Sequence, residues 1–276
     1  MVMKKGFWII LCMFFIPLVT FAGNMKLHYD RPAEYFEEAL VIGNGTMGAT
    51  LYGGVKKDKI SFNDITLWTG EPESENSSPD AFNVIPEIRA LLDNEDYEGA
   101  DKAQYKVQGH YSENYQPLGT LTIEYLDDTA GISDYHRWLD IGNATARTQY
   151  LKDGKLFTSD YFASAPDSVI VIRLKSENKE GIHALLSFDS PLPHSSQVAD
   201  NEISVEGYAA YHSFPVYYKA EDKHRYDPER GIHFKTLVRV LSVDGSVKNR
   251  YSDSRIEIDG STEVLILIAN VTSFNG

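Results

Sequence analysis

Four side chains near the start of the chain are of the kinds that line sugar-binding sites. Asn44 lies in a glycine-rich run, and Asn63, Thr66 and Trp68 follow in a polar segment that ends at Gly70. Amides and hydroxyls hydrogen-bond sugar hydroxyl groups, and the face of a tryptophan stacks on a pyranose ring. The sequence therefore predicts substrate-binding roles for these four residues. A glycine-rich hairpin beside a core tryptophan is the alternative interpretation.

Other catalytic and metal-binding patterns are absent from the sequence. The glycines of this run are followed by no Lys-Ser or Lys-Thr pair, so they do not form a phosphate loop. The histidines form no H-E-x-x-H zinc pattern, and no Gly-x-Ser-x-Gly elbow occurs. We therefore predict no metal and no cofactor. His194 and His212 flank loops and are the histidines best placed to touch a ligand, with plain solvation as the alternative.

Two motifs around the predicted sugar-binding residues resemble glycoside hydrolase family 95, the inverting α-L-fucosidases. That family opens with an Ile-Gly-Asn-Gly turn and continues with Asn-Glu and Thr-Leu-Trp-Ser-Gly. This chain has Ile42-Gly43-Asn44-Gly45, then Asn63-Asp64-Ile65-Thr66-Leu67-Trp68-Thr69-Gly70. Asp64 replaces the expected Glu and Thr69 the expected Ser, and both replacements keep the type of chemistry. Further matches are found at Tyr115–Gly119, Tyr135–Ile141 and Ala163–Asp167.

The resemblance implies the N-terminal β-sandwich of an α-L-fucosidase, without its catalytic (α/α)6 barrel. The family's general acid and its water-activating residues lie in that barrel, so we assign no catalytic residue here and expect this chain alone to be inactive. Inverting glycosidases need two carboxyl groups about 6.5–9.5 Å apart. Asp64, Glu71 and Asp140 lie near matched motifs, but we interpret them as solvated or structural carboxylates.

The implied function is to support the barrel, and to lend a loop to its sugar site, in an enzyme acting on fucosylated glycans. One alternative is a stand-alone carbohydrate-binding module, with Trp68, Trp138, Tyr115 and Tyr211 as an exposed aromatic platform. A phosphorylase relative and a hydrolase complete in this chain are further alternatives. The fucosidase motif favours the first interpretation, and the lack of an acid–base signature disfavours the last.

The first residues and the overall charge indicate an exported protein. Residues 1–22 have the basic start, apolar run and small-x-small end of a signal peptide, and they contain Cys12, the only cysteine. We therefore predict a secreted or periplasmic protein with no membrane segment after signal removal. The net charge is −14, which argues against nucleic acids or anionic membranes as partners.

The remaining pattern predicts a mainly β fold. Short segments of alternating apolar and polar residues, separated by turns, are typical of a large antiparallel β-sandwich, here a super-sandwich. Leu121, Ile123 and Tyr125 illustrate the inward face of one such strand. Helical spacing predicts a short insertion of two helices around residues 82–106. We expect one domain over residues 23–276, with loops at 189–197 and 220–230.

Overall fold

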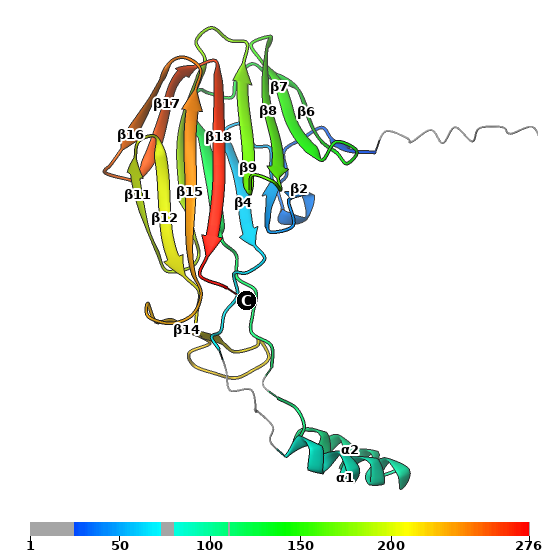
Figure 1. The fold of residues 1–276 in the computed structure, drawn as a ribbon. Coiled ribbons are helices and arrows are strands. Elements are labelled where there is room, and N and C mark those ends of the chain that lie inside the picture. The colour runs from blue at the N-terminus through cyan, green and yellow to red at the C-terminus, as the bar shows by residue number, and fades with distance from the viewer. Residues whose placement is uncertain (1–24, 73–79, 110, 276) are drawn as a thin grey trace, which may run out of the picture.

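A computed structural model describes residues 25–72, 80–109 and 111–275. The predicted signal peptide lies outside these residues. Two large antiparallel sheets form a sandwich (Figure 1), which confirms the predicted fold class. The apolar residues of both sheets share one continuous core.

The larger sheet has nine strands in the described residues. Their spatial order is β1 (Lys26–Tyr29), β6 (Ile132–Asp140), β7 (Thr145–Lys152), β8 (Lys155–Ser164), β9 (Val169–Ser176), β18 (Glu263–Thr272), β15 (His233–Ser242), β12 (Glu202–Tyr208) and β11 (His194–Ala199). The turn between β7 and β8 contains Asp153 and Gly154, which both have positive φ. That geometry suits a two-residue hairpin.

The smaller sheet has seven strands in the described residues. Their order is β16 (Ser246–Arg250), β17 (Arg255–Ser261), β10 (Ile182–Asp189), β5 (Gly119–Tyr125), β4 (Lys57–Asp64), β3 (Met47–Leu51) and β2 (Leu40–Gly43). Inward and outward residues alternate along β5, where Leu121, Ile123 and Tyr125 are buried as predicted. This alternation places one face of the sheet in the core and the other toward solvent.

The predicted helical insertion is also present. It consists of α1 (Ala81–Asp93) and α2 (Tyr97–Gln104), and Asp96 caps α2 by accepting a hydrogen bond from the Gly99 amide. The helices lie beside each other, well away from the sheets (Figure 1). Among the described residues, no helix has the length and hydropathy needed to cross a membrane.

Several segments differ from the sequence-based expectation. The predicted loop at 189–197 contains the start of β11, and the predicted loop at 220–230 contains β14 (His224–Arg225). β14 pairs with β13 (His212–Ser213) in a small separate sheet. These two short strands lie at the end of the sandwich where β4, β12 and β18 finish, which we name the base (Figure 1).

Candidate functional site

Asn44 organises the tight turn between β2 and β3. Its side-chain oxygen accepts hydrogen bonds from the Thr46 amide at 3.1 Å, the Thr46 hydroxyl at 3.0 Å and the Met47 amide at 2.8 Å. Its amide nitrogen donates to the Ser164 carbonyl at 3.0 Å, which ties the turn to the other sheet. These contacts give the predicted sugar-binding residue a structural role in this conformation.

Asn63 lies on the outer face of β4, in an open groove of about 770 Å³. Small residues of β2 and β3 form much of the groove, and Tyr115 lies along it. A Cβ atom at Gly48 would lie only 2.6 Å from the Asn63 side-chain oxygen, so the glycine allows this amide its position. Of the four predicted binding residues, the described structure places only Asn63 among the residues lining this groove.

Thr66 belongs to a polar network beneath β4 that is centred on Asp64. The Thr66 hydroxyl lies 2.6 Å from the Asp64 carboxylate and also 2.6 Å from the Thr272 hydroxyl. Asn270 donates to the other Asp64 oxygen at 2.8 Å and accepts from Thr236 at 2.7 Å. Asp64 is only 6% exposed. The network therefore fastens the end of β4 to β18 and β15 in the opposite sheet.

Trp68 packs at the surface, half exposed. Its indole nitrogen donates to the Ile65 carbonyl at 3.0 Å, and its ring meets Tyr115 edge to face with centroids 5.5 Å apart. Trp68 and Tyr115 are 41% and 39% exposed. Of the four predicted side chains, Trp68 and Asn63 are therefore the two that retain accessible surface beside a neighbouring aromatic ring.

The other two carboxylates near the matched motifs are engaged in pairs. Glu71 forms a two-point ion pair with Arg230, whose hydrogen bond holds the pKa of Glu71 below its ordinary value. A hydrogen bond from Asn143, and secondarily Lys26, lowers the pKa of Asp140. A glycosidase's general acid needs a raised pKa. The environments of Glu71 and Asp140 lower the pKa instead.

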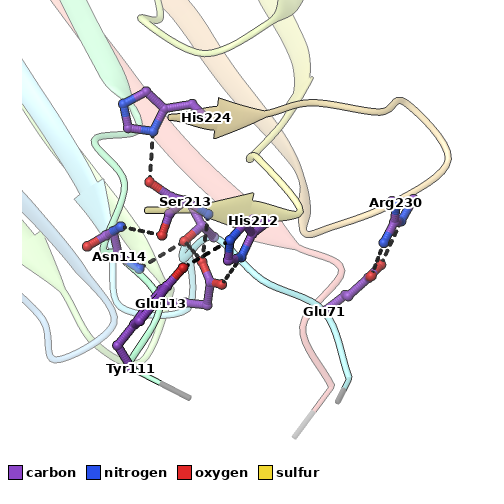
Figure 2. A network of polar contacts seen from close by, with 9 residues as sticks. Glu71, Tyr111, Glu113, Asn114, His212, Ser213, His224 and Arg230 are labelled. Atoms are coloured by element: carbon purple, nitrogen blue, oxygen red, sulfur yellow. Dashed lines mark hydrogen bonds and ion pairs between the residues drawn. The ribbon is translucent and has the colours of Figure 1, made fainter. Parts of the chain in front are cut away.

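A second polar cluster lies at the base and brings together residues from distant parts of the chain (Figure 2). We name it the base network; it consists of Thr69, Tyr111, Glu113, Asn114, His212 and Ser213. Glu113 is its centre and accepts hydrogen bonds from the Thr69 hydroxyl at 2.5 Å, His212 Nδ1 at 2.7 Å and the Ser213 amide at 3.0 Å. Asn114 adds contacts to Thr69 and to the Ser213 carbonyl.

His212 lies between Glu113 and Tyr111. Because the Glu113 carboxylate can only accept, a neutral His212 places its proton on Nδ1 and presents Nε2 as an acceptor. The Tyr111 hydroxyl lies 3.2 Å from Nε2 and can donate to it. Burial, and then the charge of Glu113, raises the pKa of Tyr111 above its ordinary value. Glu113, His212 and Tyr111 thus form an ordered chain of hydrogen bonds.

The base network holds a projecting hairpin of residues 211–226, which we name the aromatic hairpin. The rings of Tyr111, His212, Phe214 and Tyr218 pack against one another with centroids 4.5–6.3 Å apart. Val216 and Tyr217 at its tip are 86% and 77% exposed. The sandwich therefore presents accessible aromatic groups on a supported loop.

Comparison with known proteins places this architecture in a family. The family model for the N-terminal domain of glycosyl hydrolase family 65 matches residues 27–276. The chain belongs to this family of glycosyl hydrolase N-terminal domains. The match covers both sheets, the helical insertion and the aromatic hairpin.

Three relatives of this N-terminal domain carry the names of fucosidases. It is 28% identical to "Alpha-L-fucosidase 2" of Arabidopsis thaliana over 91% of this chain, and 28% identical to "Probable alpha-fucosidase A" of Aspergillus niger over 96%. A protein of the same name from Aspergillus oryzae is 23% identical over 87%. These matches confirm the predicted resemblance. The chain spans about a third of the length of these relatives.

The base network of this N-terminal domain was only partly indicated by the sequence. His212 was predicted as a histidine placed to touch a ligand, and the structure puts it in the network. Tyr111 and Glu113 carried no motif, because their partner lies about a hundred residues further along the chain. Within residues 25–72, 80–109 and 111–275, no three His, Cys, Asp or Glu side chains gather in a way that would hold a metal ion.

Proposed function

We propose that this chain is the N-terminal sandwich domain of an exported α-L-fucosidase-like glycoside hydrolase that acts on fucosylated glycans. The observation that carries the proposal is the 28% identity to "Alpha-L-fucosidase 2" across 91% of the chain. Because the chain spans about a third of that relative, its role is to accompany a catalytic domain rather than to cleave the glycosidic bond by itself.

The hydrogen-bond partners of three carboxylates favour a supporting role for this domain over a catalytic one. Asp64 is held by Thr66 and Asn270, and Glu71 is paired with Arg230. Glu113 at the base accepts three hydrogen bonds. Carboxylates engaged in this way order the loops at the base, whereas acid–base catalysis of glycoside hydrolysis needs two that can exchange protons with the substrate and water.

The base is the end of the sandwich that would face a catalytic domain. The last described strand, β18, ends there, next to the aromatic hairpin (Figure 1). Any polypeptide continuing from β18 starts from this end. We therefore expect the hairpin to be the part of the domain that contributes to the sugar site.

Release of fucose tests this proposal. The whole gene product, with whatever polypeptide continues beyond residue 276 and called here the full-length protein, is incubated with an α-1,2-fucosylated oligosaccharide, and free fucose is measured beside residues 23–276 alone. We expect turnover by the full-length protein and none by residues 23–276. Turnover by residues 23–276 would show that the chain is catalytic by itself. A lack of turnover by the full-length protein, on this and other fucosylated glycans, would reject the fucosidase assignment.

Export is proposed from residues 1–22 and has its own test. N-terminal sequencing of the protein recovered from the periplasm or medium should find a start at or near Gly23. Recovery of an intact N-terminus in the cytoplasm would exclude this part of the proposal.

A stand-alone carbohydrate-binding module is the second candidate, favoured by the groove that contains Asn63 and Tyr115. An amide next to an aromatic ring in a groove open to solvent is a suitable site for a sugar chain. Calorimetric titration of residues 23–276 with fucosylated oligosaccharide distinguishes the candidates. Binding that Asn63→Ala abolishes would favour the module, and binding unaffected by that variant would not.

A further inference from the structure

The aromatic hairpin exposes side chains that a folded protein normally buries. Tyr217 is 77% exposed and Val216 86% exposed, while Tyr218 is half exposed although its ring stacks on Phe214 with centroids 5.2 Å apart. Behind them, Tyr111 and His212 form a second aromatic layer. Large tyrosine rings at a loop tip provide both a stacking face and a hydroxyl for hydrogen bonds.

Contacts between its two arms order this hairpin. β13 and β14 pair, the Phe214 amide donates to the Lys223 carbonyl at 2.9 Å, and Lys223 reaches the Val216 carbonyl at 3.0 Å. The Arg225 guanidinium lies 5.2 Å from the Phe214 ring. A loop ordered before binding loses less conformational entropy when a ligand arrives, so its contacts contribute more to affinity.

Glu113 ties the hairpin to the sandwich from below. It binds His212 and the Ser213 amide at the start of the hairpin and Thr69 on the segment that leaves β4 (Figure 2). A second fastening joins Arg230, which lies 3.6 Å from the Tyr211 ring, to Glu71. The position of the hairpin tip therefore depends on a small number of polar contacts at its root.

We infer that Tyr217 and Tyr218 bind the sugar residues next to the fucosyl unit, and that Glu113 and His212 position them. This inference rests on the proposed function and names which part of the glycan the domain contacts. The exposed tyrosines offer stacking and hydrogen bonding, and the carboxylate at the hairpin root is committed to three donors. Such a loop adds binding energy for the glycan without taking part in bond cleavage.

Two substrates distinguish glycan binding by the hairpin from a general effect on activity. 2′-Fucosyllactose carries sugar residues beyond its fucosyl unit, whereas 4-nitrophenyl α-L-fucoside carries a single sugar. In the full-length protein, Tyr217→Ala should lower kcat/KM for 2′-fucosyllactose about 10-fold, mostly through KM. For the aryl fucoside the change should stay within about 2-fold. Tyr251→Ala is the matched control, because Tyr251 is 73% exposed in the turn after β16.

Glu113→Gln tests the positioning role. The variant keeps the size of the side chain but loses the charge that orders His212 and Thr69. We expect a higher KM for 2′-fucosyllactose with little change in kcat, and the thermal unfolding temperature checks that the sandwich itself remains folded. A loss confined to kcat would contradict a positioning role and would indicate that Glu113 acts in the chemical step.

The outcomes distinguish this inference from the proposed function. If the unmodified protein cleaves both substrates and Tyr217→Ala affects both equally or neither, the inference is wrong and the proposed function stands. If the unmodified protein cleaves neither, the proposed function fails, and calorimetric titration with 2′-fucosyllactose then decides the hairpin's role. Binding that Tyr217→Ala weakens about 10-fold would support sugar contact; absent or unaltered binding would overturn it.

Discussion

Asp58 is a carboxyl group buried in the core, and its titration should make stability depend on pH. It lies on β4, is only 1% exposed, and accepts hydrogen bonds from the Gly54 amide at 2.9 Å and the Tyr161 hydroxyl at 2.8 Å. Removal from water is the largest effect and raises the pKa of Asp58 from 3.8 to about 6, although both hydrogen bonds lower it. The folded state thus retains a proton that the unfolded chain releases.

The size and sign of the effect follow from this shift. One pKa unit corresponds to about 1.4 kcal/mol, so the raised pKa of Asp58 corresponds to about 3 kcal/mol. Because the folded pKa is raised, the stabilising contribution is fully present below about pH 4. It is lost as the pH rises to about 6, and it stays constant above that. This is the opposite direction to a carboxylate held in an ion pair.

Urea unfolding at several pH values between about 4 and 7 measures the effect, with Asp58→Asn as the reference. The other carboxylates contribute equally to both proteins, so the difference in free energy of unfolding isolates Asp58. We expect the unmodified protein to lose about 2–3 kcal/mol relative to Asp58→Asn across this range. The sequence pI is about 5.0, so dilute protein is needed to limit association near that pH.

A second variant sharpens the test. Tyr161→Phe removes a hydroxyl that stabilises the charged form of Asp58, so the loss of stability should extend to higher pH. A difference between the unmodified protein and Asp58→Asn that stays constant with pH would refute the reasoning. So would a difference that grows in favour of the unmodified protein as the pH rises.

Three further predictions concern the residues around the predicted sugar site. Asn44→Ala removes an acceptor of three hydrogen bonds and should cost about 2 kcal/mol in urea unfolding, whereas Asn83→Ala on the exposed side of α1 should change little. Asp64→Ala leaves the Asn270 amide without its acceptor and should lower the free energy of unfolding by about 2–3 kcal/mol. An unchanged midpoint of urea unfolding would show that the network does not stabilise the fold. Gly48→Ala should cost less than about 1 kcal/mol in thermal unfolding, because the Asn63 oxygen that its Cβ would meet at 2.6 Å ends an exposed side chain that can rotate away; Gly142→Ala, with its nearest contact at 3.5 Å, is the control.

The strands that the sequence predicted and those it missed differ in their place in the sheets. The alternation of Leu121, Ile123 and Tyr125 identified β5, which is an interior strand. β1, β11 and β16 were not predicted as strands, and each lies at the edge of its sheet. An edge strand pairs on one side only and commonly carries polar or charged residues. Every residue of β1 is exposed, so this strand has no alternation of buried and exposed residues.

The candidate site shows what a local sequence motif does not predict. The motifs that resembled fucosidases led to Asn44 and Thr66, whose polar atoms are engaged in tight turns and in contacts between the sheets. A motif of polar residues in one short segment is equally typical of a conserved turn and of a binding surface. Glu113 and His212 meet across 99 positions of sequence, and no local pattern predicts such a pair.

The contact between Glu113 and His212 depends on the sandwich through a series of hydrogen bonds. The Asp64 network fixes the end of β4 against β18, and the chain then continues to Thr69, which pairs with the Asn114 carbonyl at 2.8 Å. Thr69 and Asn114 flank Glu113, and Glu113 holds His212 at the root of the aromatic hairpin. Residues in one hydrogen-bonded network are energetically coupled. The motif at Asp64 and Thr66 is therefore connected, through Thr69 and Glu113, to the root of an exposed hairpin far along the chain.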